Sequence, residues 1–142
     1  MTSTAAERFA EGFAAIDRTN LSTLADLYHE DMVFIDPLHE IRGLAAMRAY
    51  CANLYANVSE IRFDFHHCQQ LNPTDAVLRW TMTYRHPRLK GGLPIALDGC
   101  SFLEFRGEKV CRHRDYFDAG ALLYEHLPVL GSVIGWLKGR LA

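Results

Sequence analysis

Three residues of this 142-residue chain have the chemistry and the spacing for proton transfer. Asp36 ends an apolar run and directly precedes Pro37. His113 and Asp115 lie one residue apart in a segment of alternating polarity, so their side chains share one face if the segment is a β-strand. A carboxylate and an imidazole on one face can serve as general acid and base, or can activate a water molecule. We therefore take Asp36, His113 and Asp115 as candidate catalytic residues.

Each candidate also has a purely structural explanation. An Asp and a His that both face the interior can satisfy each other's hydrogen bonds and only order the core. Asp36, placed before a proline, fits a residue that caps a turn. Burial among aromatic side chains would favour catalysis, because it raises the pKa of a carboxyl group toward neutrality. The sequence leaves both explanations open.

The hydrophobic spacing predicts which elements carry these residues. Apolar residues recur with the period of a helix in three segments of the first half: 5–18, 20–28 and 44–57. Met32 to Asp36 is expected to form a short strand that ends at Pro37. Four longer segments alternate with a period of two, which predicts an antiparallel meander: 61–68, 77–85, 95–105 and 110–117. A C-terminal helix is expected after Asp118, interrupted by Pro128 and Gly131.

Grouped helices followed by grouped strands indicate an α+β fold. We expect residues 1–142 to form a single domain: a cone-shaped, curved antiparallel sheet with the N-terminal helices packed on its concave face and a C-terminal helix. A cone of this size is expected to enclose a pocket. The predicted inward positions name its walls: Tyr50, Trp80, Met82, Tyr84 and Phe117. A slip of one residue in the strand 77–85 would instead turn Arg79 and Thr81 inward.

The composition limits the kinds of molecule and the compartment that we expect for this protein. The chain has 15 Lys and Arg against 17 Asp and Glu, for a formal net charge of −2, so there is no basic excess for nucleic acid. Four cysteines without a Cys-x-x-Cys motif indicate reduced thiols and a cytoplasmic protein. The apolar stretch 121–141 contains charged residues and is not a transmembrane helix; we expect it to fold over the pocket or a neighbouring subunit.

Two segments carry a family resemblance. The first is Val33-Phe34-Ile35-Asp36-Pro37 with the following Gly43-Leu-Ala-Ala-Met-Arg-Ala-Tyr50, and the second is Arg114-Asp115-Tyr116-Phe117-Asp118. The first resembles a stretch of ketosteroid isomerases, and the second resembles the end of the sheet in limonene epoxide hydrolase. Both belong to the nuclear-transport-factor-2-like superfamily, which also includes the SnoaL-like polyketide cyclases. The resemblance covers nearly the whole chain and indicates the fold, which hosts many different functions.

The resemblance also implies roles for individual residues. Asp36 falls where the isomerase keeps its general base, which works with a Tyr and a protonated Asp. Those two positions hold Phe13 and Ser101 here, so the isomerase oxyanion hole is not expected. We count Phe13 and Ser101 among the ligand-binding residues, although ordinary strand packing also explains Ser101.

The second candidate carboxylate, Asp115, is implied by the resemblance to the epoxide hydrolase. Asp115 matches one of its two catalytic Asp residues. The strand that should supply the other Asp and an Arg holds Trp80 and Met82 at its inward positions. The sequence therefore keeps one carboxylate of the isomerase pattern and one of the epoxide hydrolase pattern. It contains neither complete catalytic set.

The sequence thus predicts a small-molecule pocket protein. The first hypothesis is a cofactor-independent acid/base enzyme of the isomerase, cyclase or hydrolase type, acting on a small apolar oxygen-containing compound. No metal or organic cofactor is implied. A non-catalytic module for a hydrophobic ligand and a structural dimerisation module remain as alternatives. We expect a homodimer formed through the outer face of the sheet, and no nucleic-acid or membrane partner.

Overall fold

The computed structural model describes residues 3–122 and 128–141. The helices of this part are α1 (Ala5–Ala14), α2 (Leu24–Leu27), α3 (Leu44–Asn57), α4 (Ala119–Leu122) and α5 (Pro128–Leu141), with 3-10 turns at Leu21–Thr23 and Lys90–Gly92. The strands are β1 (Tyr28–Ile35), β2 (Glu40–Arg42), β3 (Glu60–Gln70), β4 (Asp75–Arg85), β5 (Ile95–Arg106) and β6 (Lys109–Phe117). In this part of the chain, no helix has the length and apolar character needed to cross a membrane.

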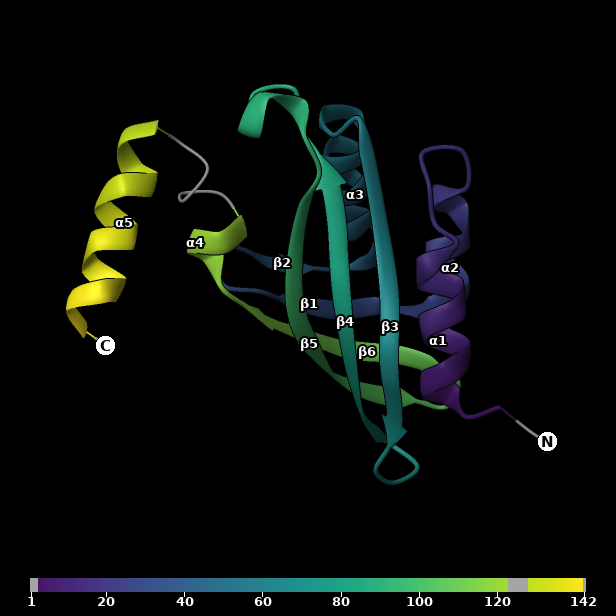
Figure 1. The fold of residues 1–142 in the computed structure, drawn as a ribbon. Coiled ribbons are helices and arrows are strands. Elements are labelled where there is room, and N and C mark those ends of the chain that lie inside the picture. Colours follow the sequence, from purple (N-terminus) through teal and green to yellow (C-terminus); the bar gives the residue numbers. More distant parts are fainter. Residues whose placement is uncertain (1–2, 123–127, 142) are drawn as a thin grey trace.

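The strands form one curved, six-stranded sheet in the order β2-β1-β6-β5-β4-β3 (Figure 1). Strands β3 to β6 make the predicted antiparallel meander. Strand β1 lies beside β6 and runs parallel to it, with Ile35 opposite Arg114. The α+β class and the curved sheet are confirmed, and the pairing of β1 with β6 adds a parallel pair to a sheet expected to be antiparallel.

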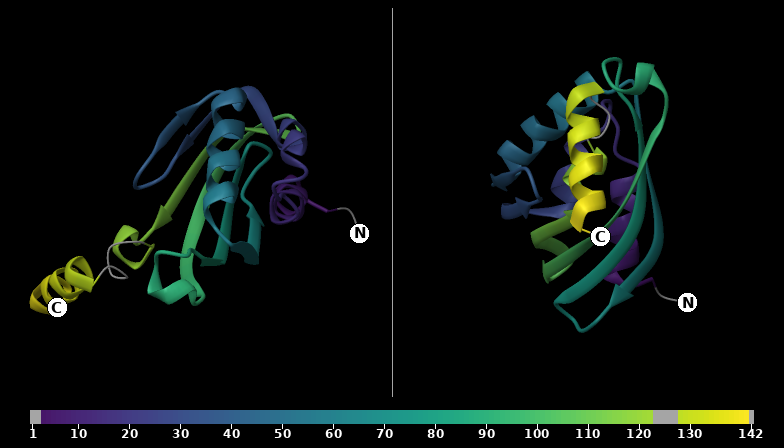
Figure 2. Two further views of the ribbon diagram at one scale, coloured as in Figure 1. Left: turned by 90° about the horizontal axis from the view of Figure 1, so that it is seen from above. Right: turned by 60° about the vertical axis from the view of Figure 1, so that its left-hand side comes forward.

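Helices α1 and α3 close the concave side of the sheet (Figures 1 and 2). Thr4 begins α1 through a capping box with Glu7, and Phe9 is buried on the sheet. In α3, Met47, Cys51 and Tyr55 are buried at intervals of four residues, which places them on one face of the helix. These two helices and the sheet form the walls of the cone.

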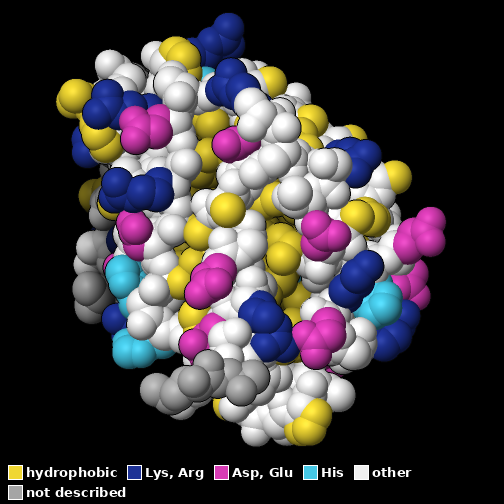
Figure 3. Space-filling view, turned by 90° about the vertical axis from the view of Figure 1, so that its right-hand side faces the viewer, with side chains coloured by type: hydrophobic (Ala, Val, Ile, Leu, Met, Phe, Trp, Pro, Cys, Tyr) yellow, Lys and Arg dark blue, Asp and Glu magenta, His cyan; other side chains and the backbone are white. Residues whose placement is uncertain are grey.

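The outer surface of α1 is polar. On the face that carries it, charged side chains of both signs are interspersed and hydrophobic atoms show between them (Figure 3). An ion pair of 2.6 Å joins Arg8 to Glu108 in the β5–β6 turn.

Element boundaries differ from the sequence prediction in the first third of the chain. Helix α1 ends at Ala14, because the next residues form a turn in which Asn20 accepts the Asp17 N–H at 2.7 Å and donates to the Ala15 carbonyl at 2.8 Å. Asn20 therefore orders this turn, and its side chain makes no capping hydrogen bond to the 3-10 turn that follows. The hydrophobic spacing predicted no element between Pro37 and residue 44, and strand β2 lies there and pairs with β1.

Helix α5 stands apart from the cone (Figure 2). An ion pair between Lys138 and Asp118 links it to the start of α4. Its side chains Val133, Trp136 and Leu137 are exposed.

Candidate functional site

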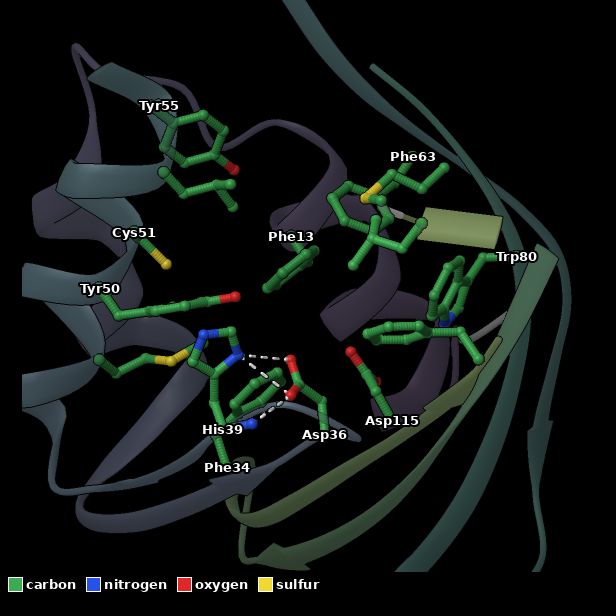
Figure 4. A pocket seen from close by; sticks show the side chains of 15 residues that line it. Phe13, Phe34, Asp36, His39, Tyr50, Cys51, Tyr55, Phe63, Trp80 and Asp115 are labelled. Atoms are coloured by element: carbon green, nitrogen blue, oxygen red, sulfur yellow. Dashed lines mark hydrogen bonds and ion pairs between the residues drawn. The ribbon is translucent and has the colours of Figure 1, made fainter. Parts of the chain in front are cut away.

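A cavity of about 100 Å³ lies between α3 and the concave side of the sheet. Helix α3 supplies Met47, Tyr50, Cys51, Leu54 and Tyr55, and the strands supply Phe34, Phe63, Trp80, Met82 and Phe117. Asp36 and Asp115 line this same cavity, together with Phe13 of α1 (Figure 4). The structure therefore brings the two predicted carboxylates together in an aromatic pocket.

Asp36 is positioned by the tight turn that joins β1 to β2. Its Oδ1 atom accepts the backbone N–H groups of Leu38 and His39, both at 2.7 Å, and its own N–H donates to the His39 carbonyl. The Asp36 side chain is only 4% exposed. Asp36 thus caps the turn and also presents a carboxylate to the pocket, so the structural and the catalytic explanations are compatible.

His39 also lines the cavity and was not among the predicted site residues. Its Nδ1 atom lies 3.1 Å from Oδ1 of Asp36, and its ring centroid lies 5.0 Å from that of Tyr50. The side chain is 42% exposed, so it links the Asp36 carboxylate to solvent. The signal was the i, i+3 spacing of Asp36 and His39 around Pro37, which is typical of a turn that brings both side chains together.

Asp115 is held from behind by a buried hydrogen-bond network. Its Oδ1 atom accepts the Ser101 hydroxyl at 2.5 Å and lies 2.6 Å from Nε2 of His113. Trp80 Nε1 donates to Ser101 Oγ at 2.9 Å, and the Tyr28 hydroxyl lies 2.7 Å from Nδ1 of His113. We assign the proton to Nε2 of His113, because an ionised Asp115 can only accept and Tyr28 can donate to the other nitrogen.

Two predicted site residues contact Asp115 and do not line this cavity. His113 is 3% exposed and Ser101 is 2% exposed, and both lie behind the carboxylate. A ligand in the cavity therefore contacts Asp115 and not His113 or Ser101. The network is the satisfied internal pair considered above, and it also fixes which oxygen of Asp115 remains available.

Tyr50, expected as a wall, presents a polar group to the centre of the pocket. Its hydroxyl points into the cavity (Figure 4) and makes no hydrogen bond to any other residue that the structure describes. Burial raises the pKa of Tyr50 above its ordinary value, and the charges of Asp36 and Asp115 add to this effect. The hydroxyl stays protonated and can donate a hydrogen bond to a bound molecule.

The register of β4 turns Trp80 and Met82 inward, as the preferred alignment predicted. Trp80 lies opposite Gly99 on β5, and its indole rests on the glycine backbone. A Cβ atom on Gly99 would lie 2.3 Å from the indole ring, so this position needs a residue without a side chain.

Tyr84 departs from its predicted place in the pocket wall. Its ring packs in a second hydrophobic cluster with Val58, Leu89 and Ile95 near the end of β4. The hydroxyl donates to the carbonyl of Leu122. Tyr84 supports α4, whose Leu122 side chain lines the cavity.

The predicted cover of the pocket by the C-terminal tail is limited to this contact. Among the residues after β6 whose side chains the structure describes, Leu122 lines the cavity and the α5 side chains of 131–141 do not. No three His, Cys, Asp or Glu side chains of the described ranges are grouped as metal ligands.

Residues 6–113 match the family model of the SnoaL-like domain. The chain belongs to this family. The matched region contains Asp36, Ser101 and His113 and ends two residues before Asp115. A search of curated proteins finds no matching relative.

Solved structures of SnoaL-like and related proteins share this fold. A hypothetical protein with a ketosteroid isomerase-like fold from Catenulispora acidiphila, solved in complex with trimethylamine, has a TM-score of 0.72 at 17% identity, covering 81% of this chain and 88% of that chain. A putative SnoaL-like polyketide cyclase from Shewanella denitrificans has a TM-score of 0.70 at 22% identity, covering 84% and 95%. An LEH-like epoxide hydrolase from M. tuberculosis has a TM-score of 0.71 at 19% identity, covering 93% and 96%.

Proposed function

We propose that this SnoaL-like protein is a cofactor-independent acid/base enzyme that moves protons on a small, largely apolar, oxygen-containing molecule. The observation that carries the proposal is the placement of Asp36 and Asp115 in one aromatic cavity. Each carboxylate has one oxygen anchored by N–H or O–H donors, which fixes its orientation before a substrate binds. Titratable groups gathered in a concave apolar pocket favour catalysis.

The geometry suggests a division of labour. Asp36 takes a proton from the substrate as general base, and His39 exchanges that proton with solvent at the mouth. Tyr50 donates a hydrogen bond to the substrate oxygen as negative charge develops there. Asp115 is the second acid/base or orienting group, and His113 keeps it in place. The missing isomerase oxyanion hole is thereby replaced by a donor on a different helix.

The size of the cavity restricts the substrate. A volume of about 100 Å³ is far above the ~10–15 Å³ that a water molecule needs, and below the roughly 300–1,000 Å³ of pockets for drug-sized ligands. The reacting part of the substrate is therefore compact, and any larger part lies at the mouth. The same aromatic walls would suit a non-catalytic binding module, and the unfilled cavity gives less support to a module that only dimerises.

We also propose that two copies associate through the outer face of the sheet in the cytoplasm. Phe102 and Tyr116 are 50% and 47% exposed on that face, and their rings pack edge to face at 5.7 Å. The Arg114 guanidinium lies 5.1 Å from the Tyr116 ring centroid. An aromatic and arginine-rich centre is typical of protein interfaces. Light scattering of Phe102→Glu against the wild-type chain tests this, and equal masses would contradict it.

The function is tested with a panel of ketone, lactone and epoxide substrates. We expect turnover by the wild-type chain and its loss in Asp36→Asn and Asp115→Asn. Asp26→Asn, on the exposed surface of α2, is the matched control and should keep full activity. Wild-type turnover in both pocket variants would contradict the proposed acid/base mechanism. A compound that co-purifies unchanged with an inactive wild-type chain would favour the non-catalytic binding module.

A further inference from the structure

We propose that the pocket recognises a compact organic cation, an alkylammonium group held between Asp36, Asp115 and the surrounding aromatic rings. The inference names the substrate class of the proposed enzyme, and it rests on the proposed function only in taking this cavity as the ligand site. Three properties of the cavity support it: its charge, its ring faces and its size.

The charge of the cavity is unbalanced. The side chains of Asp36 and Asp115 are 4% and 13% exposed, and the Oδ1 atom of each accepts hydrogen bonds from neighbouring donors. Among the described residues that line the cavity there is no Lys or Arg, and His39 at the mouth is the one basic side chain. The nearby Arg18 guanidinium instead binds the backbone carbonyls of Tyr55 and Val58.

Each of the two carboxylates has a histidine as its basic neighbour, His39 at 3.1 Å from Asp36 and His113 at 2.6 Å from Asp115, and neither pairs with a Lys or Arg among the described residues, which favours a positive ligand. Removing a carboxylate from water costs free energy unless an opposite charge replaces the lost solvation. A bound cation supplies that charge to both carboxylates, whereas a neutral ligand removes water and supplies none. An anionic ligand would add repulsion at short range, where the local dielectric is low.

The walls of the cavity suit a cation as well. Phe63 makes edge-to-face contacts with Phe13 at 5.2 Å and with Trp80 at 5.6 Å, so successive rings present different sides to the space between them. Phe34 and Tyr50 form a further pair at 5.9 Å. The face of an aromatic ring carries partial negative charge and attracts ammonium groups, most strongly those that bear alkyl substituents and hold little water.

The cavity volume of about 100 Å³ suits a small head group and not a long cationic chain. The Tyr50 hydroxyl has no partner among the described residues. It can therefore bind a second polar group of the ligand, a few bonds away from the ammonium group. The expected substrate is therefore a small carbonyl compound that also carries an alkylammonium group. The positive charge would lie against Asp115 and the rings, while Tyr50 contacts the carbonyl oxygen.

Choline and 3,3-dimethylbutan-1-ol provide the test, because they share a shape and differ in charge. The chain has two tryptophans, Trp80 in the pocket wall and Trp136, which is 60% exposed on α5. All binding measurements use the Trp136→Phe variant, so that the fluorescence of Trp80 alone reports binding. We expect choline to bind at least about tenfold more tightly than the alcohol, a ratio that corresponds to 1.4 kcal/mol. Asp36→Asn and Asp115→Asn should each weaken choline binding several-fold and leave alcohol binding unchanged, whereas Asp26→Asn should change neither.

Equal affinities for the two probes, or wild-type choline affinity in both carboxylate variants, would overturn the inference, as would the absence of saturable choline binding. The two proposals fail separately. Turnover of neutral ketones without choline binding would overturn the cation site and keep the enzyme. Choline binding together with full turnover in Asp36→Asn would keep the cation site and overturn the proposed catalytic role of Asp36.

Discussion

The imidazole of His113 lies 2.6 Å from Oδ1 of Asp115 and holds that carboxylate from the core side of the pocket. The other ring nitrogen is 2.7 Å from the hydroxyl of Tyr28, which is itself fully buried. The pair is therefore closed off from solvent behind the carboxylate. Asp115 can rotate little, and the oxygen not bound by His113 and Ser101 is the one left for a ligand.

Replacing His113 should destabilise the fold. In His113→Phe, the Tyr28 hydroxyl and one hydrogen bond to Asp115 lose their partner inside the protein, and an unsatisfied buried polar group costs about 1–3 kcal/mol. We expect the free energy of unfolding, measured by urea denaturation, to fall by about 2–6 kcal/mol, the two losses together. His67→Phe, on the exposed side of β3, is the control and should change stability by less than about 0.5 kcal/mol. Equal losses in both variants would mean that the network contributes nothing.

Asp36→Asn should separate catalysis from folding. The amide oxygen can still accept the N–H groups of Leu38 and His39, so the turn is kept while the base is lost. General acid–base groups contribute about 10²–10⁴-fold, and kcat on a responsive substrate should fall by that order while the melting temperature changes little. Asp36→Ala removes the turn acceptor as well and should lower both quantities. An Asn variant that melts as early as the Ala variant would contradict this separation.

Tyr50→Phe should reduce turnover without loss of stability. The hydroxyl has no partner among the described residues, so its removal breaks no internal hydrogen bond. Losing one donor to a developing oxyanion costs about 10²–10³ in kcat in a comparable setting. Tyr55→Phe is the matched control, because Tyr55 lines the same cavity from the next turn of α3. Equal effects of the two substitutions on kcat would assign no special role to Tyr50.

Stability should fall as the pH rises above about 9. Burial raises the pKa of the Cys51 thiol from 9.0 to about 11, and that of Tyr84 from 10.0 to about 12. Between the two values of each group the unfolded chain has already released the proton and the folded chain retains it, so increasing pH favours unfolding. Urea midpoints at pH 8, 9.5 and 10.5 should decrease in that order. In Cys51→Ala the slope between pH 9 and 11 should be smaller, and an unchanged slope would show that Cys51 does not contribute.

Gly99→Ala should disturb the pocket wall. The added Cβ would meet the Trp80 indole at 2.3 Å, and a buried indole ring, in contact with Phe63 and Phe117, has little room to move. Overpacking of this kind costs about 1–3 kcal/mol, and the near-ultraviolet circular dichroism of Trp80 should change. In Gly135→Ala, nothing lies within 4 Å of the new Cβ, and the helix-forming preference of alanine should leave stability equal or higher.

Most of the fold could be predicted from the sequence, because each helix and strand shows its own hydrophobic period within a short segment. Alternation along 77–85 predicted a strand, and the helical period of 44–57 predicted α3, whose buried face carries Met47, Cys51 and Tyr55. The parallel pairing of β1 with β6 could not be predicted in this way. The hydrophobic pattern of a strand does not depend on which strand lies beside it.

The candidate site was predictable in part. Asp36 and Asp115 could be proposed from residue type and from the family resemblance, but their presence in one cavity depends on the β1–β6 pairing. His39 was missed because hydrophobic periodicity says nothing about the turn after Asp36. His113 was placed on the right face of its strand, although its depth behind Asp115 depends on Tyr28, which comes from β1.

The pairing of β1 with β6 also has a consequence for folding kinetics. The two strands come from opposite ends of the chain, so their contacts have a high sequence separation and are expected to form slowly. Neither half of the site exists as a pocket until this pair closes, because Asp36 follows β1 and Asp115 lies on β6. A refolding chain should therefore acquire the meander of β3 to β6 first and its ligand affinity last, so binding reports the completion of folding.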